Sequence, residues 1–362
     1  MNYRITEVLP AEDLGANGVK NVEIDIGEVI SRLRFRYAFT NGTPLINIAH
    51  PAKCLSKVEL LDGSDVLESL SGMEMQAVNF YDTKKTPINF FDLDTSSVQY
   101  AVMDFNFGKY LYDEELAFDP TKFTNPKLSI TFDEDAANTS AGVGTLEILA
   151  YVFDEKAVSP AGFLMNKEHH LYTPAASSHK YIDLPDDYIL RSMFLKATTT
   201  DVDPVAQLSN IKITEENDKR IPMSISSLDL ALFDMEEYGL LRERMTNDLV
   251  VTATDWYVTP AYRVGVIPVN TGTVAAAAEL PSITIAHTHV SLGASTTTLR
   301  NKTYIDGALP HGVFAIPFGN PMDSADWYDI RAIKSLKTDI LTTADDQTSG
   351  EVALVLQQYR PY

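Results

Sequence analysis

The chain has 362 residues, of which 45% are hydrophobic, enough to fill two domain cores. Fifty acidic and 29 basic side chains give a formal net charge of −21, and Lys and Arg form no dense run. This balance argues against sequence-specific nucleic-acid binding and against a phosphate backbone as the main partner, since such binding depends on clustered basic side chains.

The first eighteen residues, MNYRITEVLPAEDLGANG, lack the basic start and apolar run of a signal peptide. No apolar stretch approaches the ~20 residues that a membrane-spanning helix requires. Cys54 is the single cysteine, which excludes a disulfide within the chain. His50 lies four residues before it and suggests a Cys/His pair, but we prefer a buried structural thiol. We therefore expect a soluble protein made in a reducing cytoplasm.

Most of the predicted elements are strands. The first, RLRFRYAF at residues 32–39, alternates so that its large apolar side chains share one face. The sequence LDGSD at residues 61–65 lies between apolar runs and predicts a hairpin. Alternation of the same kind predicts further strands at residues 127–132, 145–153, 282–290 and 351–359.

Four segments of the first half recur, in the same order, in the second half. SLSGMEM at residues 69–75 matches SISSLDL at 224–230, an offset of 155 (224 minus 69). The other pairs are IDIGEVISR (24–32) with IDLPDDYILR (182–191), YAVMDFNFG (100–108) with VFAIPFGN (313–320), and GTLEILAYVF (144–153) with GEVALVLQQY (350–359), at offsets of 158, 213 and 206. Pairing Phe105 with Phe318 gives the offset of 213. This ordered repetition predicts a tandem duplication of one domain.

A short helix is predicted to begin at the same place in each copy. Ser71-Gly-Met-Glu74 and Ser226-Ser-Leu-Asp229 both fit the Ser-x-x-acid pattern of a capping box. The second helix is predicted over residues 229–245, with Gly239 ending or kinking it. The side chains expected to pack on the core, and not to form a cofactor site, are Leu228, Leu232, Met235 and Leu241.

Several short strands in each half, separated by turn signals, predict an all-β chain with a sandwich or barrel in each copy. The second copy gains 58 residues (213 minus 155) after its helix, so we expect an enlarged, Thr-, Ala- and Gly-rich loop region at about residues 240–312. The predicted bounds are an N-terminal arm at 1–22, a first domain at 23–158, a linker containing TPAASS at 159–178 and a second domain at 179–362.

From the sequence we assign no catalytic, cofactor-binding or metal-binding residue. No Walker loop, G-x-S-x-G, H-E-x-x-H or paired C-x-x-C motif occurs. His287-Thr-His289 would place two imidazoles on one face of a strand, as in the H-x-H of a double-domain cupin, but the downstream Glu of that family is missing. His169-His170 is interpreted as part of a solvated linker.

Acidic clusters before the last strand of each copy leave a calcium site open. Asp133-Glu134-Asp135 and Asp345-Asp346 occupy equivalent hairpins and carry the oxygen ligands that Ca²⁺ prefers. We prefer to interpret them as turn-formers on an acidic surface.

Two tandem sandwiches, a capped helix in each, an enlarged loop region in the second and a final strand ending LQQYRPY resemble the double jelly-roll major capsid proteins. These build the shells of adenovirus and of tailless, membrane-containing viruses. The resemblance covers about residues 22–362. It implies two tandem eight-stranded jelly rolls with short capping helices and a structural protein without enzyme activity.

By the same resemblance, three chains form a pseudo-hexagonal trimer that tiles an icosahedral virus shell. Residues 240–312 are then outward loops, and residues 1–20 an arm beneath the shell. The implied partners are neighbouring capsomers, penton and minor capsid proteins, with an internal membrane left open. The implied location is the virion, assembled in the host cytoplasm.

Two other functions remain open at this stage. A carbohydrate- or receptor-binding sandwich, such as a phage spike, could use Trp256-Tyr257 and Trp327-Tyr328 as exposed aromatics, although core anchors are commoner. A double jelly-roll amidase would need a carboxylate pair between the two domains. A copper hydroxylase of similar architecture fits poorly, because the chain has one Cys and seven scattered His.

Overall fold

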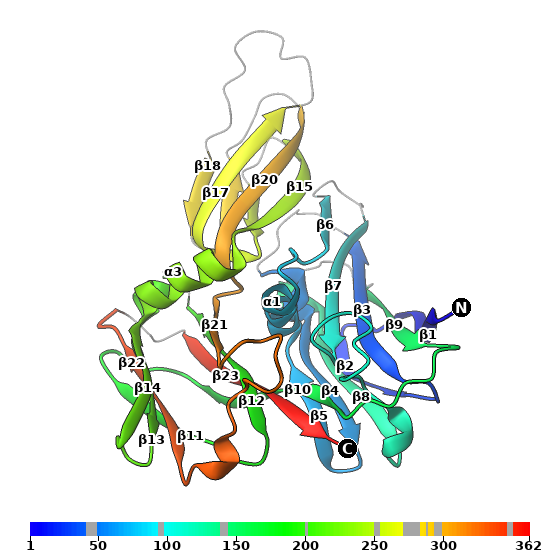
Figure 1. The fold of residues 1–362 in the computed structure, drawn as a ribbon. Helices are drawn as coiled ribbons and strands as arrows, with labels where there is room; N and C mark the ends of the chain where they lie inside the picture. The colour runs from blue at the N-terminus through cyan, green and yellow to red at the C-terminus, as the bar shows by residue number, and fades with distance from the viewer. Residues whose placement is uncertain are drawn as a thin grey trace.

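A computed structural model of the chain describes residues 1–40, 49–92, 98–137, 144–199, 202–249, 254–270, 283–286, 289–292, 299–345 and 350–362. Two β-sandwiches stand side by side, and a tall ribbon of strands rises above them (Figure 1). In these ranges, no helix has both the length and the apolar composition to span a lipid bilayer.

The first sandwich has strand orders β1-β9-β3-β7 and β2-β8-β4-β5 in its two sheets. Buried and less buried side chains alternate along β3, β8 and β9, because one face of each sheet is covered by the other. Its strands are β1 (Tyr3–Asp13), β2 (Asn17–Glu23), β3 (Ile30–Thr40), β4 (Leu55–Asp62), β5 (Asp65–Leu70), β7 (Val98–Asn106), β8 (Pro126–Asp133) and β9 (Gly144–Phe153). Helix α1 (Gly72–Thr83) follows β5, and β6 (Asn89–Asp92) precedes β7.

The second sandwich repeats this arrangement, with strand orders β10-β23-β12-β21 and β11-β22-β13-β14. Its strands are β10 (Gly162–Tyr172), β11 (His179–Leu184), β12 (Ile189–Thr198), β13 (Leu208–Glu215), β14 (Arg220–Ser226), β21 (Val313–Pro317), β22 (Leu336–Thr342) and β23 (Glu351–Pro361). Helix α2 (Pro204–Gln207) lies between β12 and β13, and α3 (Ser227–Tyr238) follows β14. Strands β1 to β5 thus correspond to strands β10 to β14. Strands β7, β8 and β9 correspond to strands β21, β22 and β23. The predicted fold, two eight-stranded jelly rolls with short capping helices, is confirmed.

The strand registers test the predicted offsets. A β-bulge follows Ile30 in β3 and Leu190 in β12, which makes these two residues equivalent at an offset of 160 (190 minus 30). They pair with Val152 and Gln358, and this confirms the final offset of 206.

The third predicted offset was two residues too long. The amide of Phe107 donates to Ser31, and that of Phe318 donates to Arg191, the bulged residues of β3 and β12. Phe318 is therefore equivalent to Phe107, not to Phe105, and the offset is 211 (318 minus 107).

The predicted domain bounds differ from the observed strands at both ends of the first roll. Residues 1–22 were expected to form an arm, but β1 pairs with β9 along the edge of one sheet and β2 pairs with β8 in the other. Residues 159–178 were expected to be a linker, but β10 begins at Gly162 and pairs with β23. The local sequence could not reveal this pairing, because the partner strands lie far away in the chain: Asn17 pairs with a residue 116 positions on (133 minus 17), and Gly162 with one 199 positions on (361 minus 162).

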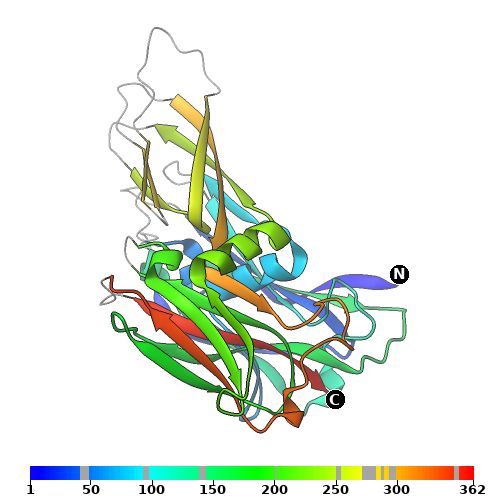
Figure 2. The same ribbon diagram turned by 60° about the vertical axis from the view of Figure 1, so that its left-hand side comes forward.

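The inserted region of the second roll was expected to be loops with one strand at residues 282–290, but it forms a tower of several strands. Its described elements are β15 (Leu241–Leu249), β16 (Thr254–Tyr257), β17 (Pro260–Asn270), β18 (Ile283–Ala286), β19 (His289–Leu292) and β20 (Leu299–Pro310). Strand β20 pairs with both β15 and β17, and these strands project well above the two rolls (Figure 2).

Both predicted helix starts are confirmed. The Ser71 hydroxyl accepts a hydrogen bond from the amide of Glu74 at 3.3 Å, and the Glu74 carboxylate accepts from the amide of Ser71 at 2.9 Å. Ser226 caps α3 in the same way, accepting from the amide of Asp229 at 3.1 Å. These bonds satisfy amides that have no partner within the helix.

The predicted length of α3 was wrong, and the set of side chains predicted to pack on the core is confirmed only in part. The helix ends at Tyr238, because Gly239 adopts φ +78°, and the residues after it enter β15. Its buried side chains are Ser227, Leu230, Ala231 and Asp234. Of the four side chains expected in the core, Leu241 is buried and Met235 packs against the core of the second roll, but Leu228 and Leu232 are exposed to 44% and 49%.

Candidate functional site: the junction between the two rolls

The two rolls are joined through an unusually apolar outer sheet face. Phe194 of β12 and Val355 of β23 point away from the core of the second roll and belong to the hydrophobic cluster of the first roll. Phe163, Met165, Val313 and Ala315 share this position. Helix α1 packs on this face, where the Tyr81 ring stacks on Phe194 at 5.9 Å between centroids. Burial of this area from water stabilises the contact between the two rolls.

A buried ion pair crosses the junction. Arg191 of β12 contacts Asp82 of α1 through Nη1, and the two side chains are 2% and 5% exposed. Gln357 of β23 donates from Nε2 to Asp82 at 3.0 Å, while Arg191 Nε donates to the carbonyl of Pro321 at 2.9 Å. The guanidinium also lies 5.9 Å from the centre of the Trp327 ring. The pair therefore has the additional hydrogen bonds that a buried charge requires.

A second buried pair lies at the N-terminus of α1. Lys196 Nζ of β12 is 3.3 Å from Glu74 Oε1, and the side chains are 9% and 1% exposed. Burial lowers the pKa of Lys196, but Glu74, Glu351 and Glu168 outweigh this and leave the pKa raised. Glu74 thus caps its own helix with one oxygen and holds the second roll with the other.

A buried polar network lies where the tower meets the rolls. Glu243 of β15 accepts hydrogen bonds from Asn89 Nδ2 at 2.8 Å and from Thr259 Oγ1 at 2.8 Å. His50 and His311 are in edge-to-face contact at 4.6 Å, and His311 Nε2 lies 2.9 Å from the side-chain oxygen of Gln76.

This burial determines the charge of the network. It lowers the pKa of His50 to about 3 and that of His311 well below its usual value. It also raises the pKa of Glu243. Both imidazoles are therefore neutral at pH 7.

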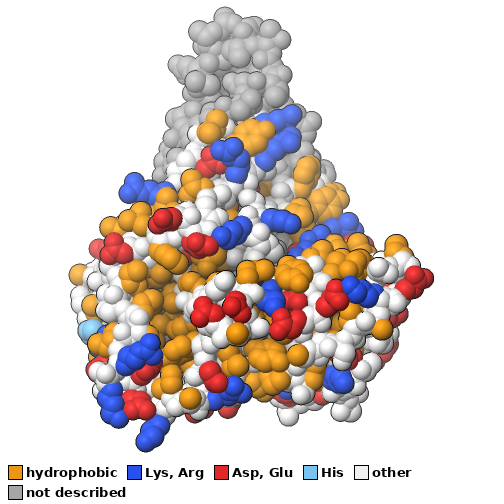
Figure 3. All heavy atoms as spheres, in the orientation of Figure 1, with side chains coloured by type: hydrophobic (Ala, Val, Ile, Leu, Met, Phe, Trp, Pro, Cys, Tyr) orange, Lys and Arg blue, Asp and Glu red, His pale blue; other side chains and the backbone are white. Residues whose placement is uncertain are grey.

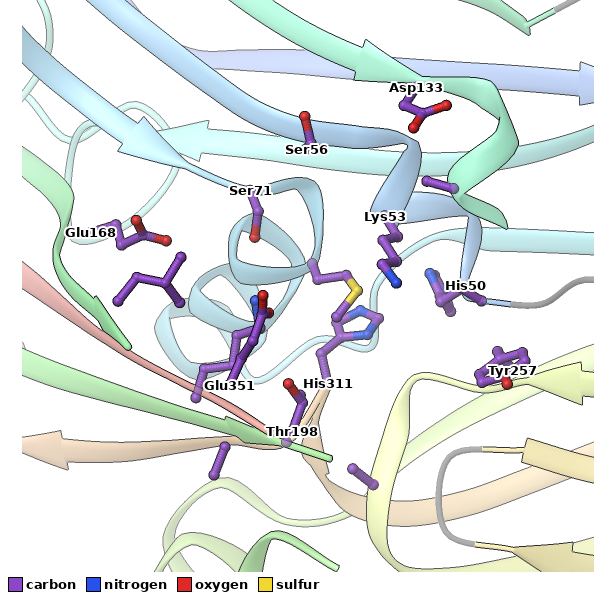
Figure 4. Close-up of a pocket in the computed structure, with 18 of the residues that line it drawn as sticks. His50, Lys53, Ser56, Ser71, Asp133, Glu168, Thr198, Tyr257, His311 and Glu351 are labelled. Atoms are coloured by element: carbon purple, nitrogen blue, oxygen red, sulfur yellow. The ribbon is translucent and has the colours of Figure 1, made fainter. Parts of the chain in front are cut away.

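A cavity of about 940 Å³ opens beside this network. Figure 4 shows His50 and Lys53 of the first roll, Glu168 and Glu351 of the second roll, and His311 of the tower base around it. The cavity therefore lies between all three parts of the molecule and is lined by charges of both signs.

The histidine motifs of the sequence do not come together at this junction. His287 lies outside the described residues, and of His289 only the backbone is described, in β19 opposite Tyr257. His169 lies on β10, exposed, with Nε2 2.9 Å from the carbonyl of Asp183. Within the described ranges, no three His, Cys, Asp or Glu side chains converge as metal ligands would.

The cysteine and the acidic hairpins have structural surroundings. Cys54 is buried, its thiol donates to the carbonyl of Glu134 at 3.7 Å, and burial raises its pKa to about 12. Asp133 accepts a hydrogen bond from the amide of Asp135 at 3.0 Å, which is the contact of a turn-forming side chain. Asp345 is exposed, and Asp346 lies outside the described residues.

The pair Trp327-Tyr328, considered as exposed aromatics or, more commonly, as core anchors, is packed against the rest of the chain. Trp327 is 6% exposed and donates from Nε1 to the carbonyl of Asn320 at 3.1 Å. Tyr328 stacks on Phe318 at 5.4 Å. The side chain of Trp256 lies outside the described residues. The Trp327-Tyr328 pair is therefore not available as a glycan-stacking surface.

The fold is shared with solved capsid proteins. The chain matches the crystal structure of the STIV major capsid protein with a TM-score of 0.60 and 12% identity, over 99% of this chain and 96% of that one. It matches the major capsid protein of bacteriophage PM2 with a TM-score of 0.56 and 13% identity, over 99% and 98%. The VP54 protein of PBCV-1 gives a TM-score of 0.56 and 11% identity, over 99% and 94%.

The predicted resemblance is thus confirmed for the fold: the chain has the double jelly-roll fold of these major capsid proteins, over almost its full length. No protein-family model and no curated protein matches the sequence.

Proposed function

We propose that the chain is the major capsid protein of an icosahedral virus and that it has no enzyme activity. The observation that carries the proposal is the match of both rolls, together and over nearly the whole chain, to capsid proteins from three viruses. The buried junction, with two ion pairs, supports it, because a shell subunit must keep the angle between its rolls fixed while it bears load.

In this proposal three chains form a capsomer with a pseudo-hexagonal outline. Each chain supplies two rolls with the same strand orders, so a threefold axis generates six similar rolls. The tower of β15 to β20 then stands on one end of each second roll and faces outward. Neighbouring capsomers, penton and minor capsid proteins are the proposed partners, with an internal membrane beneath the shell as an open question for the virion.

The proposal places the protein in the virion, after assembly in the host cytoplasm. The strands of a closed roll hide most backbone edges, and the net charge of −21 limits nonspecific association between chains. Assembly then depends on specific faces of the subunit.

The test is the mass of the purified protein by size-exclusion chromatography with light scattering, followed by negative-stain imaging. A stable trimer of ~40 kDa chains with a six-sided outline is expected. A monomer at all concentrations would contradict the capsomer, and binding to a glycan array would then favour the spike alternative.

A further inference from the structure

One face of α3 is exposed although its counterpart on α1 is buried. Leu228, Leu232 and Phe233 are exposed to 44%, 49% and 40%. Acidic and hydrophobic side chains lie next to each other over this part of the second roll (Figure 3). On α1, the equivalent positions are Met73, Ala77 and Val78, which belong to or pack against the hydrophobic cluster that also contains Phe194 of the second roll. The duplication therefore shows which kind of surface covers such a helix: the outer face of a sheet like β10-β23-β12-β21.

That kind of surface occurs twice in each chain. The second copy of it is the outer face of the β1-β9-β3-β7 sheet, which has the same strand order. The side chains of β3 that point outward are Arg32, Arg34 and Arg36. In Figure 1, α3 lies over the second roll and β3 lies in the first roll, on the opposite side of α1, so the two elements are apart from each other within one chain.

The registers tell which residues would meet. The helix caps give an offset of 155 between α1 and α3 (226 minus 71), and the matching bulges give 160 between β3 and β12. The buried pair Glu74–Lys196 then corresponds to Asp229 and Arg36. The stacked pair Tyr81–Phe194 corresponds to Glu236 and Arg34.

The residues equivalent to these two contacts carry opposite charges on α3 and on β3. Within the chain, one contact is an ion pair at 3.3 Å and the other an aromatic stack. The equivalent positions hold Asp229 and Arg36 in the first case, and Glu236 and Arg34 in the second. Two such matches at positions fixed by independent registers indicate charge complementarity between the two unpaired faces.

We propose that α3 of one chain docks on the outer face of the β1-β9-β3-β7 sheet of a second copy, with Asp229 beside Arg36 and Glu236 beside Arg34. Leu232 and Phe233 are covered in the same contact. The inference rests on the proposed trimer and names its interface. Because each chain carries one donor face and one acceptor face, the contact is heterologous, and three copies close it into a ring.

The arginines can take these partners without giving up their present ones. Arg36 contacts Glu147 at 2.7 Å, and its side chain is 44% exposed. Arg34 binds Asp104 at 2.8 and 2.9 Å and Tyr151 at 3.0 Å. A guanidinium has five N–H donors, so each arginine can bridge an acid of its own sheet and an acid of the partner helix.

The test uses charge reversal on the full chain. Asp229→Arg and Arg36→Glu are each expected to raise the protein concentration needed for trimer formation by about tenfold or more, measured by light scattering. The double variant, which restores opposite charges across the contact, is expected to return most of the affinity. Asp186→Arg, at an exposed acid in the turn between β11 and β12, serves as the control and should leave the trimer unchanged.

The outcomes separate this inference from the proposed function. A wild-type trimer that is unaffected by either reversal, or not rescued by the double variant, would overturn the α3 contact and leave the capsomer standing. A monomeric wild-type protein would overturn the capsomer itself. Arg36→Glu leaves the α3 cap intact, and the melting temperature of each variant distinguishes a lost contact from a damaged fold.

Discussion

Removal of the Asp82 carboxylate should destabilise the junction between the two rolls, because the Arg191 guanidinium would keep its charge in a buried site without its partner. The pair is 2% and 5% exposed, and Asp82 also accepts from Gln357. Breaking one side of a buried pair costs about 3–5 kcal/mol, since the remaining charge loses its partner but does not regain water. Asp82→Ala is therefore expected to lower the free energy of unfolding by that amount, well above the loss at an ordinary surface site.

The measurement is urea denaturation followed by intrinsic fluorescence, which reports Trp327 beside Arg191. Replacement of both partners, Asp82→Leu with Arg191→Met, should recover most of the loss, because no charge then stays buried. As a control, Arg242→Ala breaks an exposed pair with Asp306 and should shift the midpoint little. A midpoint for Asp82→Ala that stays close to this control would refute the reasoning.

Three further predictions concern the cap, the buried histidines and the N-terminal strands. Ser71→Ala should lower stability by about 0.5–2 kcal/mol in the same urea assay, because an amide of α1 loses its acceptor, whereas Ser71→Thr should lose little. Acidification should destabilise the protein as pH falls from about 6.5, the unfolded-state pKa of histidine, toward the lowered folded-state pKa of about 3 for His50, since the unfolded chain binds protons that the folded chain does not. Glu243, whose pKa is raised, affects stability in the opposite direction, so the wild type is compared with His50→Gln. The melting temperature of this variant should fall less than that of the wild type between pH 7 and 5, and an equal fall would contradict the role of His50. Deletion of residues 1–18 should cause aggregation, because it uncovers the β9 edge. A soluble product with the melting temperature of the wild type would instead support the prediction that this segment is an arm.

The duplicated fold could be predicted from the sequence because its signals are local. Ser71 and Ser226 mark the two helix starts by chemistry that involves only four residues each. The last strand of each copy repeats its apolar pattern, and the structure confirms the offset of 206 between them. Strand alternation and capping therefore identified the two rolls and their order.

The junction could not be predicted, because its partners lie far apart in the chain. Arg191 and Lys196 pair with acids 109 and 122 residues away. One signal was present in the sequence: both are basic residues within the otherwise apolar run ILRSMFLKA at residues 189–197. A charge in such a run indicates a buried pair.

The errors at α3 and β1 have similar physical reasons. Helical spacing shows that Leu228 and Leu232 share a face but does not show what covers that face. β1 contains Pro10 next to a register irregularity and lies at a sheet edge, where proline is tolerated and the alternation is weak.

The position of β23 has a consequence for the order in which the protein can form. This strand lies between β10 and β12, so the sheet that joins the rolls has a gap until Glu351–Pro361 is available. During synthesis, the first roll can complete its own strands once Phe153 has left the ribosome, but the second roll must wait for almost the whole remaining chain. Until then the sheet of β10, β12 and β21, which carries Phe194 on its outer face and Met193 on its inner face, has no central strand, and α1 has no complete surface to pack against. In the proposed capsomer, chains would then be able to associate only after translation of the second roll has ended, and incomplete chains would be kept out of the trimer by their own topology.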